Sequence, residues 1–215
     1  MHLTVLTPSQ QATLAKIVCA VARPGGVALL CGPQGVGVST VLTHVAASDR
    51  LAPRRVECRD IETWTSAIAE GAADVPDVVL ADDCHRAAEG DLFRLVATCR
   101  RRRPEASLVL AGEGRLLTLA SRDGRVEQAV HLRTSLRPCT IAESRALLAT
   151  RLPPAVTDDT TSTALLAIHE IGGGIPAAMI RLADLAAVVA SARHDGRFNT
   201  ADVEAVHRRL SPLAA

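Results

Sequence analysis

Residues 27–40, VALLCGPQGVGVST, carry the strongest structural signal in the chain. The first five are apolar, which suits a short strand buried on both faces, and a glycine-rich turn leads from them into a helix. The turn matches the phosphate-loop pattern G-x-x-x-x-G-K-[ST] at Gly32, Gly37 and Ser39, but Val38 occupies the lysine position. The stretch therefore predicts a strand, an anion-binding loop without its cation, and a helix.

A loop of this kind binds phosphate with its backbone. Its N–H groups converge on phosphate oxygens, the following helix adds the positive end of its dipole, and the Ser39 hydroxyl is placed to hold Mg²⁺. The alternative is a plain tight turn between a strand and a helix. The nucleotide-binding candidates are the nine residues of the turn: Gly32, Pro33, Gln34, Gly35, Val36, Gly37, Val38, Ser39 and Thr40.

A second apolar run, residues 78–81, ends in two carboxylates, Asp82 and Asp83. Carboxylates at the C-terminal end of a parallel strand emerge beside the phosphate loop, where open α/β sheets bind ligands. We expect Asp82 to hold the metal and Asp83 to activate the attacking water, although aspartate reaches one methylene less far than glutamate. Solvated acids at a strand end are the alternative.

Strand-like and helix-like segments alternate up to about residue 138, and only helices follow. A capping box at residues 7–10 opens a first helix, which ends at Pro24. We expect a parallel, doubly wound α/β core over residues 1–138 and an all-helical lid over residues 139–215. Further strands are expected at 55–58, 107–111 and 130–136, and helices at about 39–47, 63–73, 88–102, near 116, 141–152, 158–171, 176–193 and 200–209.

The composition fits a globular chain without a strong electrostatic field. Of the 215 residues, 48% are hydrophobic and 1% are aromatic, which favours helices packed on a Val- and Leu-rich sheet. The net charge is +1, so we do not expect nucleic acid as a partner. No C-x-x-C pair, signal peptide or spanning apolar run is visible. We therefore expect a cytoplasmic protein without a membrane span, with Cys31 and Cys58 as buried, reduced thiols.

Five stretches together resemble the ExeA (GspA-like) AAA+ ATPases of general secretion and, more distantly, the TniB-type ATPases of transposition. The resemblance implies ATP or ADP with Mg²⁺ held between core and lid, and a protein partner, either a homo-oligomer or an intact AAA+ paralogue. It also places Glu113 where the family carries a polar sensor of the γ-phosphate; a solvated loop residue is the alternative. The stretches are GPQGVGVST (32–40), VVLADDCHRA (78–87), LVLAGEGRL (108–116), LRPCTIAESRALLATRL (136–152) and IGGGIPAAMIRLADLA (171–186).

The chain departs from this family at its charged positions. Val38 replaces the lysine, Asp83 the glutamate and Ala177 the lid arginine, and residues 128–129 are Gln-Ala where an arginine finger could lie. Lys16 is the only lysine in a chain that otherwise uses arginine, so drift would have left arginine at position 38. A charge-assisted hydrogen bond contributes about 1.5–3 kcal/mol, so we expect nucleotide binding to be roughly 10- to 100-fold weaker without the lysine.

Loss of cations should impair turnover more than binding, because the transition state concentrates charge on the γ-phosphate. We therefore expect a degenerate AAA+ nucleotide-binding protein, impaired in hydrolysis, that regulates or scaffolds a partner. One alternative is a slow ATPase in which another cation replaces the lysine. The other is a DNA-associated adaptor that uses Arg100–Arg103, a run whose simpler role is to place cations at a helix C-terminus.

Overall fold

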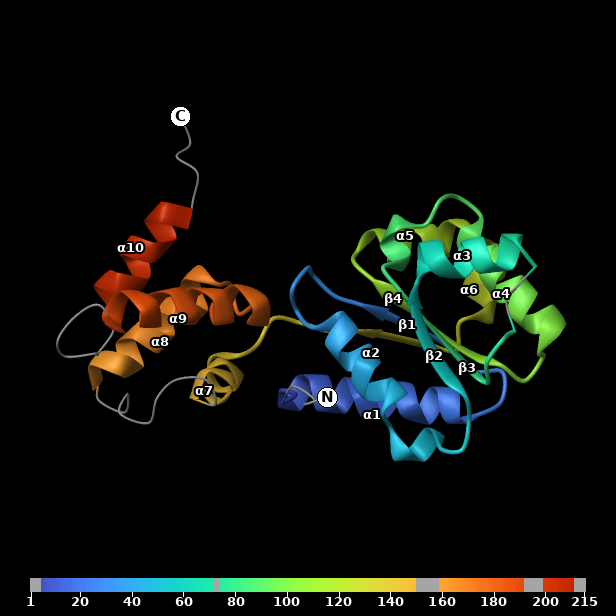
Figure 1. Ribbon diagram of the computed structural model, residues 1–215, viewed down its shortest axis with the longest axis horizontal. Coiled ribbons are helices and arrows are strands. Elements are labelled where there is room, and N and C mark those ends of the chain that lie inside the picture. The colour runs from blue at the N-terminus through green and yellow to red at the C-terminus, as the bar shows by residue number, and fades with distance from the viewer. Residues whose placement is uncertain (1–4, 72–73, 150–158, 192–198, 211–215) are drawn as a thin grey trace. The chain divides into compact units, whose positions relative to one another are not determined.

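The computed structural model describes residues 5–71, 74–149, 159–191 and 199–210 (Figure 1). The chain divides into two compact units, Met1–Arg137 and Pro138–Ala215. The first unit alternates strands and helices, and the described part of the second contains only helices. The predicted fold class, a parallel α/β core followed by helices, is confirmed.

Five parallel strands form one sheet in the order β2-β3-β4-β1-β5. The three inner strands are the continuous apolar runs of the sequence, and their residues are buried except the last of β3. The edge strands β2 and β5 are partly exposed. Because all strands run in the same direction, their carboxyl ends lie at one edge. The bounds are β1 Val27–Cys31, β2 Val56–Asp60, β3 Val78–Asp82, β4 Ser107–Gly112 and β5 Leu132–Ser135.

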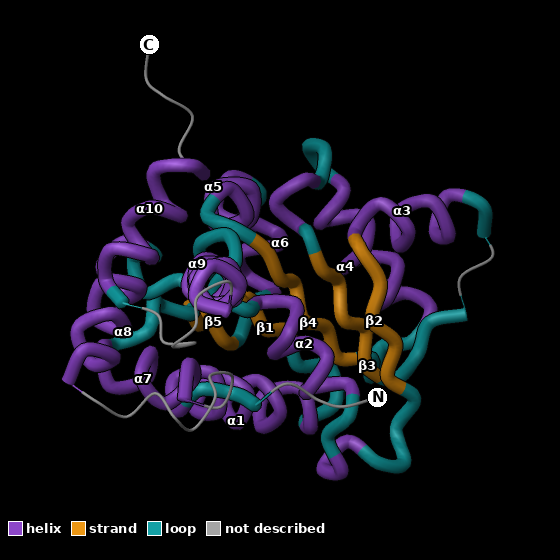
Figure 2. Tube along the Cα trace, turned by 60° about the vertical axis from the view of Figure 1, so that its left-hand side comes forward, coloured by secondary structure: helices purple, strands orange, loops and turns teal. Residues whose placement is uncertain are grey.

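Helices cover both faces of the sheet (Figures 1 and 2). α1 and α2 pack on the face that carries Ala28 and Leu30, and α3 to α6 pack on the face that carries Leu29. The alternation of neighbouring strand residues between the two cores follows from the pleat of the strand. The bounds are α1 Pro8–Ala22, α2 Val38–Ala46, α3 Ile61–Ala69, α4 Asp91–Arg102, α5 Arg115–Arg122 and α6 Gly124–Ala129.

The second unit has its own apolar core, to which all four of its described helices contribute. A triple-glycine turn separates α8 from α9, and Gly174 in it has a φ of +68°. The Gly174 carbonyl accepts the Cys139 N–H at 2.8 Å, which ties the turn to the start of the unit. The bounds are α7 Ile141–Ala149, α8 Asp159–Ile171, α9 Pro176–Ser191 and α10 Thr200–Leu210. The predicted helix ends at 150–152, 158 and 192–193 lie outside the described residues.

Several element boundaries differ from the sequence-based expectation. α3 starts two residues early because Asp60 caps it, accepting the Thr63 N–H at 2.7 Å. α4 starts only at Asp91, after Gly90 with a φ of +84°. The short helix α6 was not predicted; it begins where the Asp123 side chain accepts the Arg125 N–H at 3.1 Å. Local caps, which periodicity does not detect, set all three boundaries.

The prediction that Cys58 is buried was wrong. Cys58 lies on the edge strand β2 and is exposed, as is Cys19, whereas Cys31 lies in the inner strand β1 and is buried. All six cysteines are free thiols, and the remaining three are buried. An edge strand has a neighbour on one side only and is covered less completely than a strand inside the sheet, which explains the difference.

Candidate functional site

The predicted phosphate loop lies between β1 and α2, at the carboxyl edge of the sheet. The Gly32 N–H donates to the Gly112 carbonyl at 3.2 Å, and the Val36 N–H donates to the Pro33 carbonyl at 3.2 Å. Gly35 and Gly37 have φ angles of +79° and +103°. These left-handed conformations are open to glycine at little cost, so the tight turn depends on both glycines.

The loop presents backbone N–H groups that have no acceptor among the described residues. The N-cap of α2 is a glycine, so no side chain accepts from the first turn of the helix. Unpaired N–H groups at a helix N-terminus, together with the helix dipole, form a site that favours an anion. The groups belong to Gly35, Gly37, Val38, Ser39 and Thr40.

The lysine position is filled by an apolar side chain that packs inward. Val38 is partly buried and contacts the core on the α1–α2 face. A Cβ built on Gly32 would lie 3.2 Å from Val38 Cγ2 and 2.5 Å from Val36 Cγ1. The two valines therefore occupy the base of the loop, where Val38 offers a phosphate no charge.

The two acids follow directly after the buried part of β3. Asp82 and Asp83 are both partly buried. The Asp83 N–H donates to Asp82 Oδ1 at 2.8 Å, which leaves the second oxygen of Asp82 available to another ligand. Asp83 has a φ of +52°, a conformation that aspartate tolerates better than most residues. The backbone therefore turns sharply as soon as the strand ends.

Strand β4 connects the loop to the acids. It lies between β1 and β3, with Cys31 in register with Gly112 and Ala81 in register with Leu110. A Cβ on Gly112 would lie 2.9 Å from the backbone nitrogen of His85. The chain after the acids thus runs against the glycine whose carbonyl accepts the first N–H of the loop. The structure brings residues 32–40 and the acids to one edge of one sheet.

His85 links the acids to the predicted sensor Glu113. The Glu113 N–H donates to His85 Nδ1 at 3.3 Å, and Glu113 Oε1 lies 3.9 Å from His85 Nε2. The Arg115 guanidinium donates to the His85 carbonyl. Because Nδ1 accepts, a neutral His85 carries its proton on Nε2, on the side of the Glu113 carboxylate.

Two site residues were missed by sequence reasoning. His85 follows the acids in the sequence, but its contact with Glu113 spans 28 residues. Gln10 belongs to the recognised capping box of α1, yet its side chain also donates to the Val36 carbonyl in the phosphate loop. No local pattern gives either contact.

A pocket of about 580 Å³ lies elsewhere, between α4, α5 and α6. Phe93, Arg115, Arg122 and Arg125 line it, and neither the loop nor the two acids does. The Arg125 guanidinium stacks over the Phe93 ring at 3.5 Å and pairs with Asp123 at 3.1 Å. Arg125 is therefore held by contacts within its own unit.

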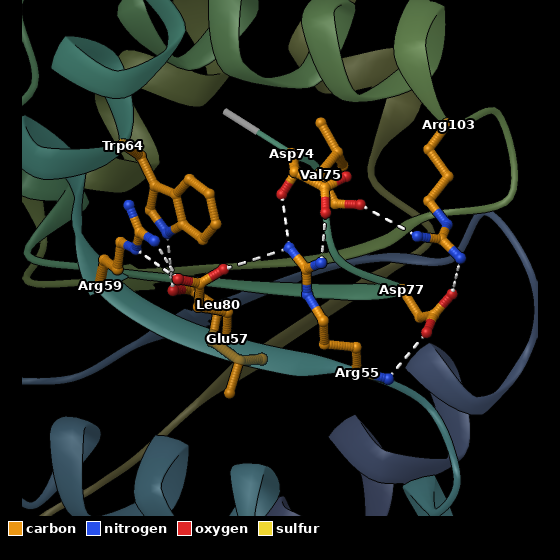
Figure 3. A network of polar contacts seen from close by, with 9 residues as sticks. All are labelled: Arg55, Glu57, Arg59, Trp64, Asp74, Val75, Asp77, Leu80 and Arg103. Atoms are coloured by element: carbon orange, nitrogen blue, oxygen red, sulfur yellow. Dashed lines mark hydrogen bonds and ion pairs between the residues drawn. The ribbon is translucent and has the colours of Figure 1, made fainter. Parts of the chain in front are cut away.

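The run Arg100–Arg103 lies at the amino edge of the sheet, at the far end from the phosphate loop. Arg100 donates to a backbone carbonyl in the turn before β1 at 2.6 Å. Arg103 donates to the Val75 carbonyl at 3.1 Å and pairs with Asp77, just before β3 (Figure 3). At least these two guanidinium groups bind the protein itself, which supports a structural role for them.

Two features are absent from the described residues. No described helix combines the length and the apolar character needed to cross a membrane. Within the same residues, no group of three or more His, Cys, Asp or Glu side chains gathers as it would around a metal ion.

No protein-family model and no curated protein matches the sequence. Solved structures do match. The RuvB Holliday junction branch migration motor of Thermotoga maritima is 18% identical, with a TM-score of 0.67, over 94% of this chain and 68% of that one. The Aeropyrum pernix ORC2 protein, solved as ADPNP–ADP complexes, is 15% identical, with a TM-score of 0.66, over 97% and 71%. The ORC1 protein of the same organism, solved in complex with DNA, is 18% identical, with a TM-score of 0.68, over 96% and 66%.

At these identities the similarity establishes the fold. It spans nearly the whole chain and includes both the sheet and the helical unit. The resemblance to ExeA and TniB proteins rests on sequence alone. The chain has the fold of an AAA+ P-loop ATPase.

Proposed function

We propose that the chain binds ATP or ADP with Mg²⁺ at residues 32–40 and is impaired in hydrolysis. One observation carries the proposal: the loop keeps its array of unpaired N–H groups, while Val38 fills the lysine position and packs into the core. The backbone part of phosphate binding is thus present and the cationic part is absent.

Each site residue has a role in this proposal. The loop N–H groups bind phosphate oxygens. The Ser39 hydroxyl is exposed and makes no hydrogen bond within the described part of the chain, and Asp82 has one carboxylate oxygen free. Both are hard oxygen ligands that suit Mg²⁺, which also takes phosphate oxygens and water. Asp83 orients the attacking water, and Glu113 lies in the sensor position.

Weak hydrolysis follows from the charges that are missing. Val38 leaves the γ-phosphate without the cation that the ExeA-like pattern would supply. The acidic Glu113 adds negative charge at the same edge of the sheet. Since charge develops on the γ-phosphate in the transition state, these changes raise the barrier more than they weaken binding.

The proposed role is to regulate or scaffold a protein partner, either further copies of this chain or an intact AAA+ paralogue of ExeA type, in the cytoplasm. A protein that binds nucleotide without rapid hydrolysis stays in one bound state, which suits a regulator or scaffold better than a motor. The contacts of Arg100 and Arg103 with their own unit argue against the DNA-adaptor alternative.

Titration with labelled ATP and ADP, with and without Mg²⁺, tests the proposal. We expect saturable binding of both nucleotides and phosphate release close to background. Asp82→Asn should weaken binding only when Mg²⁺ is present, whereas Asp49→Asn, which neutralises an exposed acid outside the site, should change nothing. Absence of binding at millimolar nucleotide would exclude the proposal, and steady release abolished by Asp82→Asn would favour the slow ATPase.

A further inference from the structure

Gln10 connects helix α1 to the phosphate loop. The residue is buried, with 7% of its surface exposed. Gln10 Oε1 accepts the Thr7 N–H at 2.9 Å, and Gln10 Nε2 donates to the Val36 carbonyl at 2.9 Å. The two contacts fix the orientation of the amide, since the flipped group would set donor against donor and acceptor against acceptor. A glutamate could complete the capping box but, when ionised, could not donate to Val36.

The contact with Gln10 completes the backbone hydrogen bonding of Val36 and so holds the two peptide groups that flank this residue. The Val36 N–H is bonded to Pro33 and its carbonyl to Gln10. That carbonyl lies four residues before Thr40, where a longer helix α2 would use it as the acceptor of the Thr40 N–H. Because the Val36 carbonyl accepts from Gln10 instead, the Thr40 N–H remains one of the loop N–H groups without an acceptor.

Gly37 makes this close approach feasible. A Cβ on Gly37 would lie 2.4 Å from Gln10 Nε2, so a larger residue would displace the glutamine. The glycine of the phosphate-loop pattern therefore serves a second purpose here, beyond its φ of +103°.

Helix α1 provides a rigid anchor for this contact. Ile17, Val18 and Val21 on it are buried in the core, and the helix packs against α2, β1 and β4. The position of Gln10 is therefore set by the same core that carries the phosphate loop. A side chain anchored in this way can hold the loop in one conformation before any ligand arrives.

We propose that Gln10 is a positioning residue of the phosphate loop, which keeps the Val36 carbonyl directed at α1 and the loop N–H groups directed at the anion. The expected effect of Gln10 on nucleotide affinity rests on the proposed function, whereas its effect on the conformation of the loop does not. Loss of one such hydrogen bond should weaken nucleotide binding about 2- to 10-fold.

Three single variants separate this role from helix capping. Gln10→Glu keeps an acceptor for Thr7 and removes the donor to Val36. Thr7→Ala removes the capping hydroxyl and leaves the contact with Val36 intact. Gln11→Glu makes the same change of charge one residue away, on an exposed side chain whose Nε2 bonds to Leu6. Hydrogen exchange of the Val36 and Val41 amides, which have acceptors within the loop, is followed by NMR in the nucleotide-free protein, and ADP affinity is measured separately.

We expect Gln10→Glu alone to accelerate exchange at Val36 and Val41, by about fivefold or more, and to weaken ADP binding. Thr7→Ala should lower the melting temperature without either effect. Equal exchange in Gln10→Glu and Gln11→Glu would overturn the proposal. Should Gln10→Glu fail to fold, Gln10→Ala carries the same expectation without added charge. If the wild type binds no ADP, the proposed function fails, while the exchange data still decide the role of Gln10.

Discussion

Val38 packs against the base of the phosphate loop, in the position that the loop pattern gives to lysine. In the proposed function, the missing lysine is the reason for weak phosphate binding, because the rest of the loop keeps its backbone donors. Valine is also too short to reach a phosphate from its partly buried position. We therefore expect Val38 to limit the affinity for phosphate without disturbing the fold.

Restoring the cation should raise affinity. Val38→Lys is expected to tighten ATP binding about 10- to 100-fold, the equivalent of one charge-assisted hydrogen bond. Isothermal calorimetry measures the change, and Val38→Ala serves as the control for lost packing, with affinity near that of the wild type. An unchanged affinity in Val38→Lys would mean that the loop does not present this position to a phosphate.

Thiol reactivity tests the burial of single residues. Burial raises the pKa of the Cys31 and Cys99 thiols to about 11, so these thiols hold their protons at neutral pH and are shielded from reagent. Cys19 and Cys58 are exposed, but desolvation of its thiol and the nearby Asp82 raise the pKa of Cys58 to about 11. A thiol reagent such as DTNB should therefore label Cys19 rapidly and Cys58 more slowly in the native protein at pH 7.5, and all six cysteines in denaturant. Rapid labelling of more than two would contradict the packing of the sheet.

At the scale of elements, caps decide where the helices begin. Asp60 caps α3, and its pKa is lowered by the hydrogen bonds that it accepts from the Thr63 backbone and side chain. The lowered pKa means that this stabilisation is present above the unfolded pKa of aspartate, about 3.9, and is lost as the pH falls through the folded value.

Asp60→Ala should therefore lower the free energy of unfolding by about 1 kcal/mol at pH 7, and Asp60→Asn by less, because asparagine also caps well. Trp64, the single tryptophan, reports the transition by fluorescence, since it is buried and its indole N–H donates to the Leu80 carbonyl at 3.1 Å. The loss in free energy of unfolding caused by Asp60→Ala should become smaller below pH 4, because the wild-type cap is then protonated. A deficit independent of pH would contradict the charged cap.

Arginine contacts stabilise the edge of the sheet at which the parallel strands begin. Arg103 and the Arg55 backbone both bond to Asp77, at the turn that precedes β3 (Figure 3). Arg103→Gln should lower the free energy of unfolding by about 0.5–1 kcal/mol, a value discounted for solvent exposure. Arg101 is the matched control, because it is exposed and makes no hydrogen bond or ion pair among the described residues. The free energy of unfolding of Arg101→Gln should stay within about 0.5 kcal/mol of that of the wild type. Salt-sensitive retention on DNA that these variants abolish would instead support an adaptor.

The sequence predicted the inner strands well and the boundaries less well. Residues 27–31, 78–81 and 108–111 are apolar throughout because an inner parallel strand is buried on both faces. Cys58 was misplaced because the order of strands, which makes β2 an edge, is a property of the sheet as a whole. The short helix α6 was missed because its cap at Asp123 gives only a weak local signal.

At the scale of the whole molecule, the α/β fold and the order of its elements could be predicted because apolar, strand-like runs alternate with helix-like segments and a glycine-rich loop follows the first strand. The gathering of residues 32–40 with the acids at one edge also follows, since parallel strands end together. Contacts such as Gln10 with Val36 or His85 with Glu113 could not be predicted, because they join elements far apart in the sequence. Solved structures of RuvB and ORC proteins match this fold.

Titration of ¹⁵N-labelled protein with Mg²⁺–ADP tests the central claim, that the loop backbone binds phosphate without a lysine. The account predicts that the amide signals of Gly35, Gly37, Val38, Ser39 and Thr40 shift together along one saturable curve by millimolar ADP. Signals in the loop that stay fixed while others shift, or no shift at any residue, would contradict it.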